Sequence, residues 1–158
     1  STDQWVLFDF GATRSYSDEF LLAYYRMIKG ALISDQAMLR SAAKNLKFIY
    51  DTDDPLLVEK FEVFCEQTIE PFLNPNDPRQ KGPMDAEGNY DWKNTDLPQR
   101  LSKQVLDIIK NHKWRTPPRE ILFLDRKTGG VFIILALLKS KMKARPLFMK
   151  YLESVNEP

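Results

Sequence analysis

The spacing of apolar residues along the chain predicts a mainly helical protein. In several segments, apolar side chains recur three to four residues apart, which is the period of an amphipathic helix. The first segment begins after Ser17 and ends at Gly30, and the second is expected to be capped by Ser34. A third helix begins at Asp54-Pro55, because proline is tolerated in the first helical turn, and runs to about Leu73.

Three more helices are predicted in the second half of the chain. One runs from about Asp96 to Asn111 and places on a single stripe Leu97, Leu101, Val105 and Ile108. The next begins at Thr116-Pro117-Pro118, and its apolar face is expected to hold Ile121, Leu124, Thr128, Val131, Leu135 and Leu138. A short last helix contains Leu147, Phe148, Tyr151 and Leu152.

Gly129 and Gly130 fall inside the fifth predicted helix. Each glycine weakens a helix by about 0.5–1 kcal/mol relative to alanine, so a structural reason for the pair is expected. We expect another helix to pack closely against them, with a helix kink as the alternative.

One strand is expected, near the start of the chain. Trp5-Val6-Leu7-Phe8 is a continuous apolar run closed by Asp9 and Gly11, which favours a buried strand that ends in a turn. The predicted fold class is therefore mainly α, with about six helices and one short N-terminal strand. A strand without a neighbour exposes unpaired amides and carbonyls, so a weak homodimer formed through this strand is expected.

The length of 158 residues and the hydrophobic content of 43% suit a single domain over residues 1–158. Four segments are expected within it: the strand and its turn at 1–14, three helices at 15–73, a surface loop at 74–95 and the C-terminal helices at 96–158. The loop is predicted from its prolines, glycines and polar residues, and Tyr90 and Trp92 are expected to pin its far end.

Charge and cysteine usage narrow the class of protein. Lys and Arg number 23 against 22 Asp and Glu, a net charge of +1, so no nucleic-acid partner is expected. The most apolar window, Val131–Leu138, is too short to cross a membrane. The lone cysteine, Cys65, falls on an apolar helical face and has no second cysteine to pair with, which favours a reducing, cytoplasmic location.

The single histidine and one cluster of basic residues are further functional candidates. The single histidine, His112, lies beside lysines at a helix end, where compensation of the helix dipole is favoured over catalysis. A basic cluster follows the fifth helix and consists of Lys139, Lys141, Lys143 and Arg145. A solvated helix end is the favoured interpretation, and contact with anionic lipid head groups at the periphery of a membrane is the alternative.

The motif that carries chemistry is Asp9-Phe10-Gly11. After an apolar strand, this is the arrangement in which the aspartate of a kinase leaves the sheet and coordinates magnesium on the nucleotide phosphates, while the glycine permits the turn. The tripeptide alone is a weak signal, because a carboxylate at a strand end also caps turns.

The residues around this motif resemble the UbiB/AarF family of atypical kinases, which includes the ubiquinone-biosynthesis ATPases. The first matching stretch is Leu7-Phe8-Asp9-Phe10-Gly11-Ala12-Thr13-Arg14, followed by Tyr16 and Phe20. The second runs from Pro117 to Leu124 and continues through Arg126-Lys127 to Gly129-Gly130, and it resembles the C-terminal helix of that family. The resemblance covers essentially the whole chain, which corresponds to the last part of the family's kinase-like domain.

The resemblance implies a fold that is part of the C-lobe of an atypical kinase plus its C-terminal helical extension. It implies that a longer parent protein binds Mg²⁺ and ATP and supports ubiquinone or other isoprenoid-lipid metabolism. Asp9, Phe10 and Gly11 would form the nucleotide-binding turn, with Asp9 as the metal ligand and Arg14 as a weaker candidate. The nucleotide lysine and the catalytic loop precede Asp9 in the family, so this chain alone is expected to hold no catalytic residue, no cofactor and no activity.

The expected partners are the missing N-terminal part of the same kinase-like domain and proteins of lipid or quinone biosynthesis. The chain departs from the family at Asp125, where members usually carry a histidine, so no role of that histidine is carried over. Asp125 is expected to pair with Arg126, Lys127 or a neighbouring turn. The competing hypothesis is a noncatalytic helical scaffold or interaction module, in which Asp9 only caps a turn.

Overall fold

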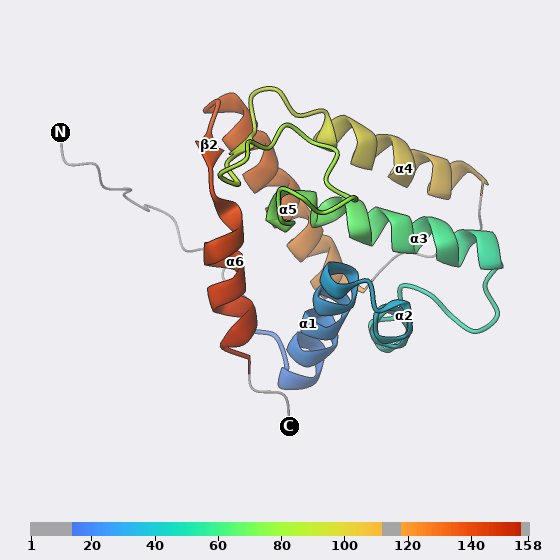
Figure 1. Cartoon of the computed structure of the whole chain (residues 1–158). Coiled ribbons are helices and arrows are strands. Elements are labelled where there is room, and N and C mark those ends of the chain that lie inside the picture. Colours follow the sequence, from blue (N-terminus) through green and yellow to red (C-terminus); the bar gives the residue numbers. More distant parts are fainter. Residues whose placement is uncertain (1–13, 112–117, 156–158) are drawn as a thin grey trace.

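The computed structural model describes residues 14–111 and 118–155. Within these residues it contains six α-helices, one short 3₁₀ helix and two short strands (Figure 1). In chain order they are α1 (Asp18–Ile33), α2 (Gln36–Asn45), α3 (Pro55–Thr68), η1 (Glu70–Phe72), β1 (Tyr90–Asp91), α4 (Leu97–Asn111), α5 (Arg119–Leu137), β2 (Lys141–Met142) and α6 (Ala144–Glu153). The mainly helical fold class is confirmed. The predicted strand at 5–8 lies outside the described residues.

The first three helices begin at side chains that accept backbone hydrogen bonds. Ser17 caps α1 and Asp54 caps α3 as predicted, accepting from the amides of Phe20 (3.2 Å) and Leu56 (3.0 Å) respectively. The predicted cap of α2 is wrong by one residue. Asp35 accepts from the Met38 amide at 2.9 Å, whereas Ser34 ends α1 in the left-handed conformation.

Gly30 does not end α1 but lies inside it, where α2 crosses closely. A Cβ atom at Gly30 would lie only 2.8 Å from the backbone nitrogen of Leu39 and 3.0 Å from the carbonyl oxygen of Asp35. Glycine is therefore required by the close approach of the two backbones and not by helix termination. This is the packing role that the sequence reasoning expected of the glycines in α5.

The main core lies between α1, α2 and α3. Figure 1 shows α3 running between α4 on one side and α1 and α2 on the other. The fully buried side chains of this core include residues of α2, α3, the turns that follow them and α5: Leu39, Ala43, Ile49, Phe61, Leu73 and Ile121. The ring of Phe148 stacks on Phe72 with centroids 4.3 Å apart, and this contact holds α6 against η1.

A second, smaller core holds the end of the segment between η1 and α4. Tyr90 and Trp92 are buried at this end, as predicted, together with Leu97 and Phe132. Tyr90 pairs with Met142 in a two-stranded antiparallel sheet that the sequence analysis did not predict. The sheet ties this segment to the connection between α5 and α6, and the Trp92 amide donates to the Ser140 carbonyl at 2.9 Å.

A buried carboxylate locks the same segment to η1 and α4. Arg100 Nη2 donates to both carboxylate oxygens of Glu70, at 2.9 and 2.8 Å, and the Tyr90 hydroxyl donates to Glu70 Oε1 at 2.6 Å. Gln80 Nε2 donates to the Glu70 carbonyl at 3.1 Å. A Cβ atom at Gly82 would lie 2.3 Å from Glu70 Oε1, so the loop can pass over this network only with glycine at that position.

Two expectations about α5 are wrong. Val131 and Leu138, placed on its buried face by periodicity, are 46% and 56% exposed, and the buried positions are instead Ile121 and Phe132. The stretch around Val131 is apolar on every side, so periodicity does not fix which side faces inward, and the contact of Phe132 with Trp92 does.

The expected close packing at the glycine pair is also absent. No described atom of another element lies within 4 Å of a Cβ built at Gly129 or Gly130. The helix is continuous through both glycines. At its start Pro118 occupies the N-cap position without a side-chain cap, and Thr116 lies outside the described residues. Of the described helices, none is both long and apolar enough to span a bilayer.

Candidate functional site

The segment that follows the predicted metal motif rests on α5. The guanidinium carbon of Arg14 lies 3.6 Å from the centroid of the Phe123 ring, a cation–π contact. Arg14 ends the first family-like stretch and Phe123 belongs to the second, so two stretches far apart in sequence meet in the fold. The sequence analysis gave Arg14 only as a weaker candidate at the nucleotide-binding turn, and this contact with Phe123 was not predicted.

A row of aromatic rings begins at Tyr16, two residues after Arg14, and runs into α1. Tyr16 stacks on Phe20 with centroids 5.2 Å apart, and Phe20 stacks on Tyr24 at 6.0 Å. Tyr24 in turn lines a partly open cavity between α1, α3, α4 and α5. The row therefore leads from the end of the first family-like stretch to the interior of the helical unit.

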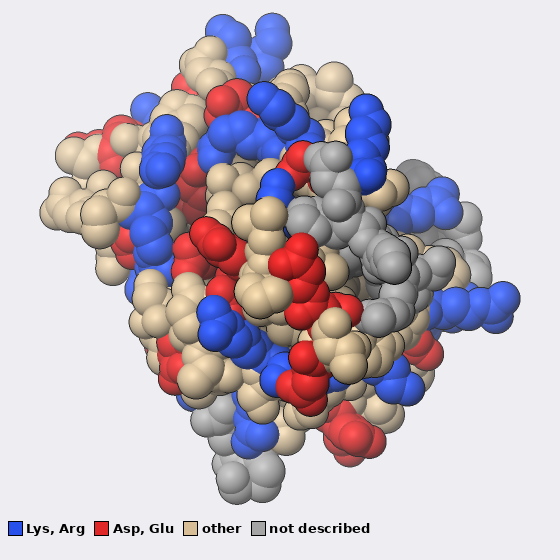
Figure 2. Space-filling view, turned by 90° about the vertical axis from the view of Figure 1, so that its right-hand side faces the viewer, with Lys and Arg blue, Asp and Glu red and all other residues tan. Residues whose placement is uncertain are grey.

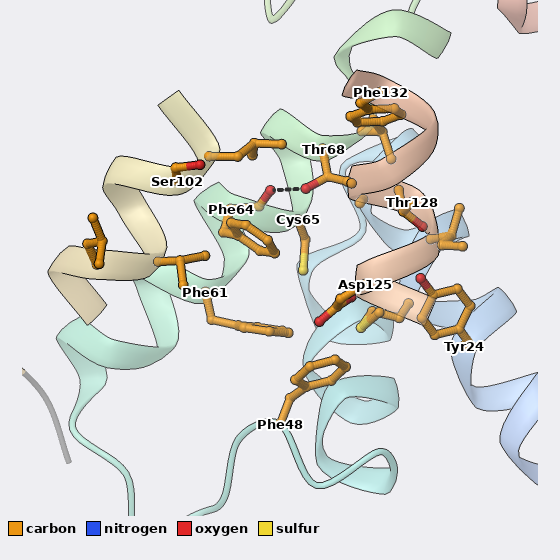
Figure 3. Close-up of a pocket in the computed structure, with 18 residues that line it drawn as sticks. Tyr24, Phe48, Phe61, Phe64, Cys65, Thr68, Ser102, Asp125, Thr128 and Phe132 are labelled. Atoms are coloured by element: carbon orange, nitrogen blue, oxygen red, sulfur yellow. Dashed lines mark hydrogen bonds between the residues drawn. The ribbon is translucent and has the colours of Figure 1, made fainter. Parts of the chain in front are cut away.

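The cavity has a volume of about 590 Å³ (Figure 3). Most of its wall is apolar, and Figure 3 shows Phe48, Phe61 and Phe64 together on one side of it. Its polar wall groups are few, and one of them is already engaged, because the Thr68 hydroxyl donates to the Phe64 carbonyl at 2.8 Å. The others are the side chains of Tyr24, Ser102, Asp125 and Thr128.

Asp125 projects from α5 toward the middle of this cavity (Figure 3). Asp125 is exposed to solvent through the open side of the cavity, and the helices that pack around its other side raise the pKa of its carboxyl to about 6 through desolvation. The expected pairing with Arg126, Lys127 or a turn is wrong: within residues 14–111 and 118–155, no hydrogen bond or ion pair engages this carboxyl.

The carboxyl of Asp125 influences two neighbouring groups. Burial raises the pKa of the Cys65 thiol and of the Tyr24 hydroxyl, and in both cases the negative charge of Asp125 is the next largest cause. Cys65 is buried in the helical core, as its apolar face predicted. Because its raised pKa keeps it in the thiol form, Cys65 is unsuited to act as a nucleophile.

The other candidates from the sequence fall into two groups. Asp9, Phe10, Gly11 and His112 lie outside the described residues. In the basic cluster, Lys141 Nζ pairs with Asp85 at 3.0 Å, and Arg145 Nη1 donates to the Phe72 carbonyl at 2.6 Å. These two residues thus have structural partners. The described part of the chain contains no group of three or more His, Cys, Asp or Glu placed to hold a metal ion.

Surface charge gives no separate site on the face shown in Figure 2. There, Lys and Arg side chains alternate with Asp and Glu side chains, and neither sign forms a continuous field. This distribution agrees with the net charge of +1.

The mainly helical fold is consistent with the part of a kinase-like C-lobe that the resemblance implies. No protein-family model and no solved structure matches the chain. Curated relatives do match. The chain is 26% identical over 148 residues to the mitochondrial atypical kinase COQ8B of Rattus norvegicus, which is 94% of this chain and 26% of that protein.

Two further relatives carry the same description. The mitochondrial atypical kinase coq-8 of Caenorhabditis elegans is 28% identical over 145 residues, which covers 90% of this chain and 17% of the relative. The mitochondrial atypical kinase COQ8 of Saccharomyces cerevisiae is 22% identical over 142 residues, which covers 90% of this chain and 26% of that relative. The resemblance is thereby confirmed: the homologues of this chain are atypical kinases of the COQ8/UbiB family. The chain spans 17% to 26% of the length of these three relatives.

Proposed function

We propose that this chain is the C-terminal part of an atypical kinase or ATPase whose parent protein binds Mg²⁺ and ATP. The observation that supports this proposal is the contact between Arg14 and Phe123, because it joins the two stretches on which the family resemblance depends. The names of the relatives support kinase chemistry for the parent. A role in ubiquinone or other isoprenoid-lipid metabolism is the biological setting that we propose with it.

In this proposal Asp9 is the magnesium ligand, and Phe10 and Gly11 shape the turn that presents it. Asp9 lies five residues before Arg14 in the sequence. Magnesium prefers oxygen ligands and takes few of them from protein, since phosphates and water supply the rest. One carboxylate is therefore a plausible contribution from this chain. The nucleotide lysine and the catalytic Asp/Asn pair would come from the upstream part of the kinase-like domain, without which the chain is inactive.

The upstream part of the domain is the partner that we propose for the outer surfaces of α4 and α5. Away from the cavity, these helices expose large apolar side chains to solvent: Ile109, Leu122, Ile133, Ile134 and Leu137. Contiguous apolar surface on a soluble protein marks a place where another element packs. The cytoplasmic location at the periphery of a membrane stays a prediction, and the three relatives described above are named as mitochondrial proteins.

The test is an ATPase assay on a protein that carries this chain together with the upstream part of the domain. Replacement Asp9→Asn should abolish magnesium-dependent ATP hydrolysis, because a neutral amide holds the metal poorly. Asp18→Asn is the matched control, since Asp18 lies exposed in the first turn of α1 and should leave the rate unchanged. Equal hydrolysis in all three proteins would contradict Asp9 as the metal ligand. No hydrolysis in any of them, or an upstream sequence without a strand lysine and a catalytic Asp/Asn pair, would favour the noncatalytic scaffold.

A further inference from the structure

We propose that the cavity between α1, α3, α4 and α5 binds a small amphipathic cation, a molecule with an aromatic or alkyl body and a protonated amine that pairs with Asp125. This inference does not depend on the proposed kinase function. It rests on the shape of the cavity, the chemistry of its wall and the unpaired carboxyl within it.

The size and lining of the cavity are those of a ligand site. Small-molecule sites have volumes of roughly 300–1,000 Å³ and combine an apolar wall with a few polar groups that fix orientation. This cavity has about 590 Å³, and its wall is dominated by apolar side chains from four helices and the loop after α2. An apolar body of one or two rings would replace solvent against this wall and gain from burial of its surface.

The carboxyl of Asp125 selects the charge of the ligand. It projects into the cavity, and in the described part of the chain no cation neutralises it. The carboxyl is exposed to solvent on one side and partly desolvated by the apolar wall on the other, so an ammonium group that enters the cavity would gain a charge-assisted hydrogen bond to it. The same carboxyl disfavours anions, so nucleotides and free phosphate are unsuitable occupants.

Aromatic rings around the carboxyl strengthen the preference for a cation. Phe48 and Phe61 lie with ring centroids 4.9 Å apart beside the open space that Asp125 faces (Figure 3). Tyr24 lies on the other side of Asp125 in the same view. An ammonium group or an aromatic body gains from contact with ring faces, so the wall and the carboxyl favour the same class of molecule.

Gly129 keeps the cavity open on the α5 side. It lines the cavity one helical turn after Asp125, whereas Gly130 does not line it. A Cβ atom at either glycine would meet no neighbouring element within 4 Å. A larger side chain at position 129 would therefore enter the ligand volume, and one at position 130 would extend elsewhere. The pair offers two variants with the same helix propensity and opposite expected effects on binding.

Binding of the cation should weaken as the pH falls through about 6, where Asp125 gains its proton. The other titratable groups that line the cavity are Tyr24 on α1 and Cys65 on α3, and Glu62 and Glu66 of α3 lie near Cys65, while α4 contributes only Leu101, Ser102, Val105 and Leu106. The raised pKa values of Tyr24 and Cys65 keep both groups neutral in this range. Glu62 is paired with Arg40, and Glu66 accepts a hydrogen bond from Gln36.

The experiment is isothermal titration of the chain, near neutral pH, with naphthylethylamine and with naphthylethanol as its neutral counterpart. A charge-assisted hydrogen bond adds about 1.5–3 kcal/mol, so the amine should bind about ten- to a hundredfold more tightly than the alcohol. Asp125→Asn should remove this difference, and Glu120→Gln, which changes an exposed carboxylate of the same helix, should preserve it. Gly129→Leu should abolish binding of both probes, and Gly130→Leu should not.

Several results would overturn the proposal. They are equal affinity of amine and alcohol for the unmodified chain, an amine preference that survives Asp125→Asn, unchanged binding in Gly129→Leu, and no binding of either probe. Circular dichroism of each variant establishes that it is folded before titration. The amine should also bind a longer protein that includes the upstream domain. If it binds only the shorter chain, the upstream domain occupies the cavity and the proposal is wrong.

Discussion

Replacement of Arg100 by methionine should leave the buried carboxylate of Glu70 without its cationic partner. Arg100 donates to both oxygens of Glu70, whose side chain is only 2% exposed, and the side chain of Arg100 is itself 25% exposed. Removing one partner of a buried ion pair costs about 3–5 kcal/mol, because the other charge stays buried without compensation. The Tyr90 hydroxyl still donates to Glu70, and water can approach from the position of Arg100, so we expect the lower end, about 3 kcal/mol.

Urea denaturation followed by circular dichroism measures this loss directly. A loss of about 3 kcal/mol corresponds to a melting temperature about 6–12 °C lower for a chain of this length. Lys44→Met is the matched control, because it breaks the ion pair with Asp51, whose side chain is 85% exposed, and should cost no more than about 1 kcal/mol. If Arg100→Met and Lys44→Met lose equal stability, the burial argument for the Glu70 network is wrong. Combining Arg100→Met with Glu70→Gln should recover part of the loss, because the second change removes the uncompensated charge.

Three further predictions address α5 and its contacts. Gly129→Ala and Gly130→Ala should each raise the free energy of unfolding in urea by about 0.5–1 kcal/mol, since neither Cβ meets another element. A lower free energy of unfolding in either variant would mean that another element does pack against these glycines. A double-mutant cycle of Arg14→Ala and Phe123→Leu should give a coupling of about 0.5–1 kcal/mol, and strict additivity would deny the cation–π contact. Asp125 has a folded pKa of about 6, above its ordinary 3.8, so its ionised form disfavours folding. Asp125→Asn should therefore be more stable than the unmodified chain at neutral pH, and the gap should shrink as the pH falls through about 6; a pH-independent gap in urea melts would contradict this.

Local patterns predicted the helices, because caps and apolar spacing act over only a few residues. Ser17 and Asp54 begin their helices as the sequence indicates. The cap of α2 was assigned one residue early, since Ser34 and Asp35 are both good caps and only the path of the chain after α1 selects Asp35. The sheet between 90–91 and 141–142 was missed because two-residue strands carry no periodic signal.

Contacts between residues far apart in the sequence determine two features that local patterns do not predict: the buried side of α5 and the cavity. Which side of α5 is buried depends on the contact of Phe132 with Trp92, and no pattern within α5 encodes it. The cavity was not predicted, because it forms only where four helices meet. Two residues of α5 mark its place in the sequence, Asp125, which projects into it, and Gly129 one turn later, which lines it, but neither forms a pattern that predicts a cavity. The metal motif, by contrast, was recognised from family-like residues, and Asp9 lies outside the described part of the chain.

The measurement that tests the central claim most directly is calorimetric titration with Mg-ATP of a protein that joins this chain to the upstream part of the kinase-like domain. The unmodified protein should bind ATP with a strong dependence on magnesium. In Asp9→Asn that dependence should disappear, whereas in Asp18→Asn it should persist. Magnesium-dependent binding of equal strength in the Asp9→Asn protein would contradict the assignment of Asp9 as the metal ligand of an atypical kinase.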